Sequence, residues 1–332
     1  MLKPPRLKEG ATIGLISPAS AADPERIDHS IANLRKLGFR VKEGKHIRSR
    51  LGFLAAPDPA RLADLHAMFA DPKVDAIMCV RGGYGTGRLA PFIDYKLIRR
   101  TPKILLGFSD VTFIHLSIWK ECELVTFNGP MLNSAFGDPR PFTIEGFRRT
   151  VMSPAPAGSI WQGHEDRNYR VVRPGRATGR LTGGNLSLVA ATVGTPAEID
   201  TKGKIVFLED VDEKPYRFDR MLTQLLLAGK LWDAAAVVFG RNVLDEETAK
   251  IEQERAKQGL PRIVAPPPTR VSREFEQTVD DVIAERMKPV GIPVIIGLPF
   301  GHIDDYATLP IGVKASMDSR TGDLVIEESA VS

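Results

Sequence analysis

The sequence predicts an α/β protein that combines a doubly wound parallel sheet with a second domain. Two observations lead to this fold class. Through the first half of the chain, short apolar runs alternate with segments of helical periodicity, and the runs end in turns rich in glycine, serine or proline. The length of 332 residues also exceeds that of one ordinary domain, so a division into about two domains is expected.

The elements of the first half follow in regular order. Strands are predicted at 12–17, 40–42, 75–80 and 104–106. Helices are predicted at 23–37, 59–69 and 111–120, where apolar residues recur every three or four positions. Gly38 directly follows the first helix, which is typical of a C-terminal cap. Function in such sheets collects in the loops after the strands, here 17–20, 81–88 and 107–110.

The composition changes after residue 150. Residues 151–178 are rich in proline, glycine and polar side chains, so they are predicted to link a domain of residues 1–150 to a domain of residues 179–332. In the second domain we predict helices at 185–193 and 218–228, strands at 204–208, 235–239 and 293–296, and a hairpin around 319–323. The strongly charged segment 245–288 is predicted to be a surface excursion, part helix and part loop.

Composition excludes several classes of protein. Hydrophobic residues make up 43% and charged residues 26%, which is typical of a globular chain and excludes a disordered one. The net charge is only +4, and no basic run carries interleaved aromatics, so no nucleic-acid partner is expected. No apolar stretch approaches the roughly 18–20 residues that span a bilayer, and we expect a soluble, cytoplasmic protein. Cys79 and Cys122 are the only cysteines and are expected to be buried free thiols, which excludes a disulfide framework.

The first candidate for chemistry is the segment Gly107-Phe108-Ser109-Asp110, where a predicted strand runs directly into a helix. A sharp strand-to-helix turn can expose a serine hydroxyl as a nucleophile. The helix start behind it offers free N–H groups for a developing oxyanion. The simpler alternative is that Ser109 or Asp110 only caps the helix.

The second candidate is the glycine-rich loop at 81–87, with the sequence RGGYGTG. Glycines let the backbone approach a ligand closely and direct N–H groups toward it. An oxyanion or carboxylate site and a plain tight turn both fit this composition. A dinucleotide loop fits less well, because the first strand-to-helix turn, near Ser17, lacks the G-x-G-x-x-G spacing.

The third candidate joins an acidic cluster at 209–213 to His302. Glu209 stands at the end of a predicted strand, where a carboxylate can orient a histidine; the same cluster could instead bind a divalent cation. Among the six histidines, only His302 follows a predicted strand and lies in a loop bounded by glycine and proline, which makes it the best general base. No cluster has zinc-ligand spacing. Ser109, Glu209 and His302 therefore predict a serine hydrolase.

At these residues the chain resembles the LD-carboxypeptidase family of serine peptidases, which includes muramoyltetrapeptide carboxypeptidases and microcin C self-immunity proteins. The resemblance rests on five separated segments in the family's order, which together span nearly the whole chain. They are 51–89, with RGGYGTGR; 102–116, with LLGFSD; 179–196, with LTGGNLSL; 207–229, with FLEDVDEKPYRFDR; and 297–312, with GLPFGHIDDY.

The resemblance implies a fold, a site and a reaction. The fold would be an N-terminal Rossmann-like domain and a C-terminal swivelling β/α domain with the active site in the cleft between them. Ser109 would be the nucleophile, Glu209 the triad acid and His302 the base. The N–H groups of Gly83 and Asp110 would form the oxyanion hole. No metal or organic cofactor is expected.

The same resemblance implies a substrate and an assembly. The substrate would be a small muropeptide, the murein tetrapeptide, which loses its terminal D-alanine at the L-centre of meso-diaminopimelate during peptidoglycan recycling. The protein would be a homodimer. We expect Arg81, Tyr84 and Ser17 to contact the substrate, since a carboxypeptidase must recognise a terminal carboxylate.

Two alternatives stay open. A microcin C immunity-like serine hydrolase would use the same triad to cleave aminoacyl sulfamoyl adenylates. A non-catalytic two-lobed protein that binds a small ligand would keep the glycine loop without needing Ser109, Glu209 and His302.

Overall fold

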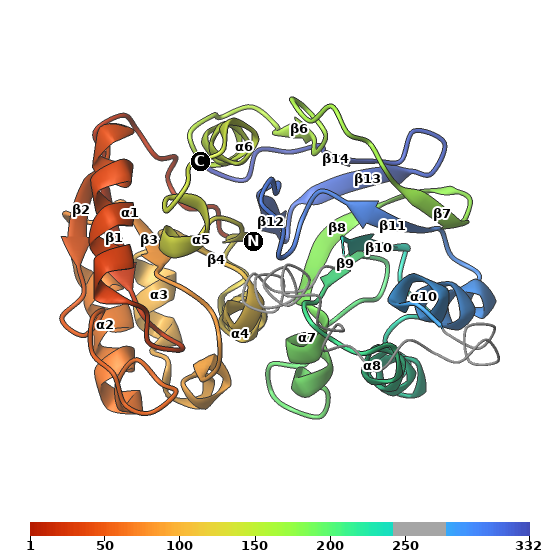
Figure 1. Ribbon diagram of the computed structural model, residues 1–332, viewed down its shortest axis with the longest axis horizontal. Helices are drawn as coiled ribbons and strands as arrows, with labels where there is room; N and C mark the ends of the chain where they lie inside the picture. Colours follow the sequence, from red (N-terminus) through yellow and green to blue (C-terminus); the bar gives the residue numbers. More distant parts are fainter. Residues whose placement is uncertain (242–276) are drawn as a thin grey trace, which may run out of the picture.

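The computed structural model describes residues 1–241 and 277–332, and it contains two β-sheets that lie side by side (Figure 1). The predicted α/β class is confirmed. Most of the charged excursion predicted at 245–288 lies outside the described residues, and its last part forms helix α10. None of the described helices combines the length and the apolar character that crossing a membrane requires.

The first sheet carries six strands of the described chain, and five of them run parallel. In spatial order they are β12 (Leu309–Ile311), β5 (Thr126–Asn128), β4 (Ile104–Gly107), β3 (Ala76–Cys79), β1 (Thr12–Ile16) and β2 (Arg40–Glu43). The chain passes from β1 to β2 on one side and then to β3 on the other, so the sheet is wound in both directions. Loops that follow β1 and β3 therefore meet at the point where the winding reverses, which is where ligands bind in open α/β sheets.

Helices connect these strands. They are α1 (Pro24–Lys36), α2 (Asp58–Ala70), α3 (Tyr95–Arg100), α4 (Thr112–Cys122), α5 (Leu132–Ala135) and α6 (Pro141–Val151). The carboxylate of Asp23 accepts hydrogen bonds from the N–H groups of Glu25 (2.8 Å) and Arg26 (3.3 Å), which fixes the start of α1. Gly38 has a φ of +94° just past its end, as predicted, because glycine adopts this left-handed conformation without strain.

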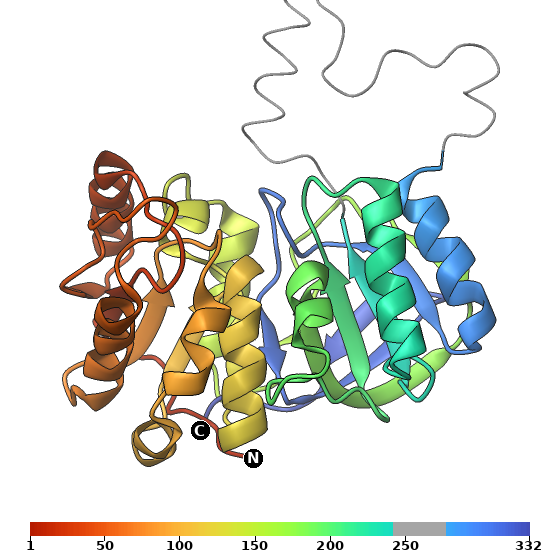
Figure 2. The same ribbon diagram turned by 90° about the horizontal axis from the view of Figure 1, so that it is seen from below.

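The second sheet is mixed. In spatial order its strands are β6 (Gly158–Ser159), β14 (Asp323–Ile326), β13 (Lys314–Asp318), β8 (Arg176–Asn185), β9 (Ile205–Glu209), β10 (Ala236–Gly240), β11 (Val294–Leu298) and β7 (Arg170–Arg173). The four central strands β8 to β11 are parallel, and the flanking ones are antiparallel. Helices α7 (Leu186–Thr192), α8 (Pro215–Leu227) and α10 (Val279–Met287) accompany this sheet, with α8 and α10 side by side (Figure 2).

The two sheets exchange segments of chain. Strand β12, from the C-terminal part, pairs with β5 of the first sheet, and the segment 151–178 supplies β6 and β7 to the second. The two ends of the chain also meet, since the Arg6 N–H donates to the Ser332 carbonyl at 3.0 Å. The division into 1–150, a linker and 179–332 stays a prediction.

Helix α4 lies where the two halves adjoin (Figures 1 and 2). The Asn185 N–H at the end of β8 donates to the Thr112 hydroxyl at the start of α4, at 3.0 Å. A Cβ on Gly184, which has a φ of +142°, would lie 2.4 Å from the Thr112 Oγ1, so only glycine permits this approach. Asn185 is in register with Glu209 on the neighbouring strand. The contact therefore brings the end of β9 close to the turn that carries Ser109.

Candidate active site

Ser109 lies at the sharp turn predicted between β4 and α4. Strand β4 ends at Gly107, and a short 3₁₀ turn, Ser109–Val111, leads into the helix. Ser109 has a φ of +62°, a left-handed conformation that costs a non-glycine residue about 1–3 kcal/mol. Ser109 is partly exposed although its neighbours Phe108 and Asp110 are buried. A strained, accessible hydroxyl at a strand-to-helix turn suits a nucleophile better than a cap.

The glycine-rich loop after β3 lies against this turn. A Cβ on Gly82 would stand 2.9 Å from the Ser109 Cβ, 3.0 Å from its Oγ and 3.4 Å from the Asp110 backbone nitrogen. Gly83 has a φ of +110°, and a Cβ there would stand 2.4 Å from the Ser20 Oγ. The loop backbone can therefore approach Ser109 at Gly82, and Ser20 at Gly83, only because both positions are glycine.

Replacement of Gly82 by alanine should lower turnover by about 100-fold, because the new methyl group would collide with Ser109 and displace it. Gly146→Ala is the matched control: no atom lies within 4 Å of a Cβ there, and neither Gly146 nor Gly82 has a left-handed φ. Steady-state kinetics with thermal unfolding of both variants checks the prediction. Equal activity of the two variants would show that the close approach of Gly82 is not needed.

Asp110 ties the glycine loop to the turn. Its Oδ2 accepts a hydrogen bond from the Thr86 N–H at 2.8 Å, and the Thr86 hydroxyl donates to the Asp110 carbonyl oxygen. Burial raises the pKa of the Asp110 carboxyl, while the hydrogen bonds from Thr86 oppose that rise. The Asp110 side chain is thus occupied within the fold, and its backbone N–H remains next to Ser109.

Arg61 supports the same loops and was missed by sequence reasoning. Its side chain is fully buried in α2 and donates hydrogen bonds to the carbonyl oxygens of Ala56 and Gly85, both at 3.0 Å, and of Pro18. It also pairs with Asp58. One guanidinium therefore fixes the loop after β1 relative to the glycine loop after β3. The sequence signal is weak: Arg61 stands four residues before Leu65, on the apolar face of the predicted helix.

Glu209 and His302 form a direct pair. Glu209 is the last residue of β9 and is completely buried, and its Oε2 lies 2.7 Å from His302 Nδ1. A Cβ on Gly301, which has a φ of +106°, would lie 2.9 Å from this Oε2, so glycine allows the loop to close on the carboxylate. The His302 ring packs edge-on against Phe108, with ring centroids 5.0 Å apart. His302 therefore lies against the residue that precedes Ser109.

The other acids of the cluster have different surroundings. Asp210 is buried and accepts hydrogen bonds from Asn185 Nδ2 (2.9 Å) and from the Ser187 N–H (2.9 Å) and hydroxyl (2.7 Å). Burial, and then the charge of Glu209, raise the pKa of the Asp210 carboxyl. Among residues 1–241 and 277–332, no three His, Cys, Asp or Glu side chains are arranged to hold a metal ion.

The three residues expected to contact the substrate lie around the glycine loop and the loop after β1. The Ser17 hydroxyl is buried and donates to the Ile47 carbonyl at 3.1 Å, so it is used within the fold. Arg81 donates to the Ala21 carbonyl at 3.2 Å. The Tyr84 ring is exposed and packs against Phe53, with ring centroids 5.5 Å apart. Arg81 and Tyr84 thus remain at the surface of the site, whereas the Ser17 side chain does not.

Comparison with known proteins gives matches over both halves of the chain. Family models described as the LD-carboxypeptidase N-terminal and C-terminal domains match residues 13–129 and 178–317. A protein of Bacillus subtilis strain 168, named a probable murein peptide carboxypeptidase, is 41% identical over 98% of this chain and 94% of its own.

Solved structures agree with these matches. A muramoyltetrapeptide carboxypeptidase from Oxalobacter formigenes superimposes with a TM-score of 0.78 at 28% identity, covering 96% of this chain and 99% of its own. An MccF-like protein from Bacillus anthracis superimposes with a TM-score of 0.81 at 27% identity, covering 99% of this chain and all of its own.

Proposed function

Because the chain belongs to the LD-carboxypeptidase family, we propose that it is a serine carboxypeptidase that removes the terminal D-alanine from murein tetrapeptides. The bond it cuts follows the L-centre of meso-diaminopimelate. One observation carries the proposal: the buried Glu209 carboxylate bonds His302, whose ring lies against Phe108 beside the strained Ser109.

In the proposed reaction Ser109 attacks the scissile carbonyl. The Glu209 carboxylate can only accept a hydrogen bond, so it holds the proton on His302 Nδ1 and leaves the lone pair on Nε2. Nε2 then takes the Ser109 proton and later gives it to the leaving D-alanine amine. Water then attacks the acyl-enzyme by the same steps, with His302 as the base, and releases the tripeptide.

The proposed oxyanion hole consists of the backbone N–H groups of Gly83 and Asp110. Asp110 stands at the start of the helical segment that follows Ser109, where backbone N–H groups lack helical partners and carry positive dipole. A Cβ added to Gly82 would lie 2.9 Å from the Ser109 Cβ and 3.4 Å from the Asp110 backbone nitrogen, and this closeness of the glycine loop supports the proposal. N–H groups held in this way need not reorganise when charge develops on the oxygen.

We also propose that the protein works as a homodimer in the cytoplasm, in peptidoglycan recycling. Cys79 and Cys122 are free and buried, as predicted, which suits a reducing compartment. No metal or organic cofactor takes part in the proposed chemistry.

The test is incubation of the protein with a murein tetrapeptide ending in D-alanine, followed by mass spectrometry. We expect tripeptide and free D-alanine. Aspartyl sulfamoyl adenosine serves as the second substrate, since the fold is shared with an MccF-like protein. Cleavage of this compound alone would favour the immunity-like hydrolase. Binding of the peptide with no turnover would favour the non-catalytic protein.

A further inference from the structure

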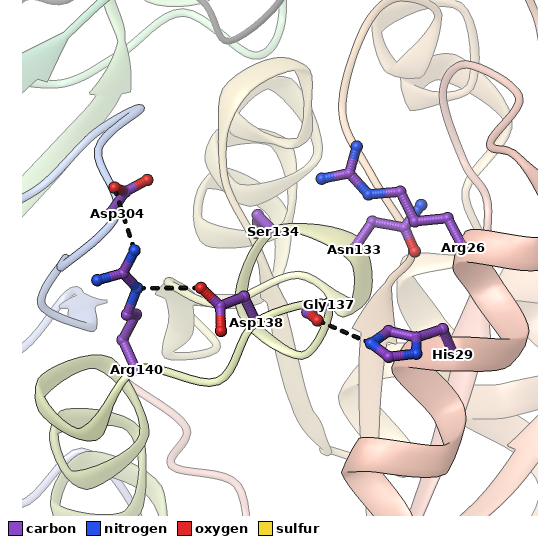
Figure 3. Close-up of a pocket in the computed structure, with 8 residues that line it drawn as sticks. All are labelled: Arg26, His29, Asn133, Ser134, Gly137, Asp138, Arg140 and Asp304. Carbon is purple, nitrogen blue, oxygen red and sulfur yellow. Dashed lines mark hydrogen bonds and ion pairs between the residues drawn. The ribbon is translucent and has the colours of Figure 1, made fainter.

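A cavity of about 280 Å³ opens next to helix α1 and the loop that follows α5 (Figure 3). Its lining comes from α1, from α5 and the loop that follows it, and from the loop that carries His302. The charged and polar side chains in this lining are Arg26, His29, Asn133, Ser134, Asp138, Arg140 and Asp304. Two arginines and two aspartates thus line a single cavity, so it offers partners to both signs of charge.

The ion pairs within the cavity are exposed ones. Arg140 lies between the two aspartates, with its Nε 3.3 Å from Asp138 and its Nη2 3.5 Å from Asp304 (Figure 3). The side chains of Arg140, Asp138 and Asp304 are 45%, 83% and 72% exposed. Pairs in such contact with water contribute little to stability. A ligand that carries both an anionic and a cationic group can pair its anion with Arg140 and its cation with the aspartates. No charge in the cavity is then left unpaired.

Asn133 provides a second, independent observation. Its side chain is only 8% exposed and lines the cavity, yet its Oδ1 has no hydrogen-bond partner among the residues that the structure describes. Buried amide groups nearly always have partners, and those that lack one call for a ligand, water or ion. The Asn133 oxygen is an acceptor, so it suits an N–H donor such as an ammonium group.

Packed side chains link the cavity wall to the candidate active site. Ser134 Oγ, at its wall, lies 2.8 Å from the Tyr306 hydroxyl. The Tyr306 ring packs against Phe108, with centroids 5.3 Å apart, and Phe108 contacts His302. Asp304 stands two residues after His302 on the same loop. The cavity wall and the candidate active site therefore share one set of packed side chains and one loop.

We propose that this cavity is a subsite for a zwitterionic head group, in which one carbon carries both an ammonium and a carboxylate. The proposal rests on the proposed function. In a murein tetrapeptide only the far end of meso-diaminopimelate has this chemistry. The carboxylate faces the guanidinium groups of Arg26 and Arg140, and the ammonium faces Asn133 Oδ1 and the two aspartates. A lone carboxylate, such as that of D-glutamate or the terminal D-alanine, would leave the aspartates without a partner.

The test compares two tetrapeptides that differ only at the third residue, with meso-diaminopimelate in one and L-lysine in the other. Lysine keeps the ammonium and lacks the carboxylate. We expect kcat/KM to favour the diaminopimelate peptide by about tenfold or more, as a hydrogen-bonded charge pair does. The Arg140→Gln variant should lose most of this preference. Arg176→Gln is the matched control, since Arg176 is an exposed arginine of β8 that pairs with Asp318 and should change neither rate nor preference.

The outcomes separate this subsite from the proposed function. Equal cleavage of both peptides would overturn the subsite and leave the carboxypeptidase in place. A peptide with D-isoglutamine in place of D-glutamate tests the other carboxylate. If the cleavage rate changes with this substitution but not with the third residue, the subsite is also overturned. Calorimetry on the Ser109→Ala variant measures the binding preference without turnover. Selective binding with no cleavage by the native chain would support the subsite and refute the proposed function.

Discussion

Replacement of Ser109 by alanine is expected to lower kcat for D-alanine release by about 10⁴-fold or more, because it removes the only atom proposed to attack the scissile carbonyl. The fold should survive, since Ser109 is partly exposed and alanine is the smaller side chain. Chromatography of the released D-alanine measures the rate, and circular dichroism on heating measures the stability. Full activity of this variant would refute the assignment of Ser109.

The conformation of Ser109 supplies a second readout. Alanine keeps the unfavourable φ of +62°, whereas glycine adopts it freely, so Ser109→Gly should be more stable than Ser109→Ala by about 1 kcal/mol. Both variants lack the hydroxyl and should be equally inactive. Ser117→Ala is the matched control, because the Ser117 hydroxyl on α4 donates to the Phe113 carbonyl at 2.7 Å and its other partner is Tyr95, so it serves the fold. It should stay active.

Local patterns predicted the elements around Ser109 because each depends on neighbouring residues. The run 104–106 became β4, the apolar period at 111–120 became α4, and the turn between them holds Ser109. Strands β5 and β12, with three residues each, carry too little pattern to be recognised. Their pairing joins residues 126–128 to residues 309–311, and no local signal encodes a contact of that sequence separation.

The roles of the acidic and basic side chains at the site depend on hydrogen-bond partners that are distant in the sequence. Glu209 and Asp210 are adjacent acids at a strand end, and successive side chains on a strand point to opposite sides. In the structure Glu209 bonds His302, whereas Asp210 accepts hydrogen bonds from Asn185 and Ser187. Composition cannot reveal this difference. Arg61 was missed for the same reason, since an arginine in a helix is usually solvated and its three carbonyl partners belong to separate loops.

The Glu209→Gln variant should lose about two to four orders of magnitude in kcat with little change in KM. Glutamine keeps the shape, but its NH₂ group can donate to Nδ1 and so stabilise the wrong tautomer of His302. Because Glu209 is completely buried behind His302, it is not expected to contact substrate. Steady-state kinetics over a range of substrate concentrations separates the two constants.

Asp210→Asn gives the contrast. Asparagine presents an NH₂ group to donors that now bond a carboxylate, so the variant should lose about 1–3 kcal/mol of stability while its kcat falls less than that of Glu209→Gln. If Glu209→Gln instead loses stability and keeps its kcat, Glu209 is a structural acid and the triad assignment fails.

A double variant decides whether the residues act together. In a working triad the acid serves only to orient the base, and the base serves only to activate the nucleophile. Once Ser109 is alanine, the Glu209–His302 pair has no proton to receive, so adding Glu209→Gln should cost nothing further in kcat. A further large loss in the double variant would mean that Glu209 contributes through the binding of substrate. Non-additivity would therefore support a catalytic unit built from both halves of the chain, in which the carboxylate at the end of β9 acts only through His302.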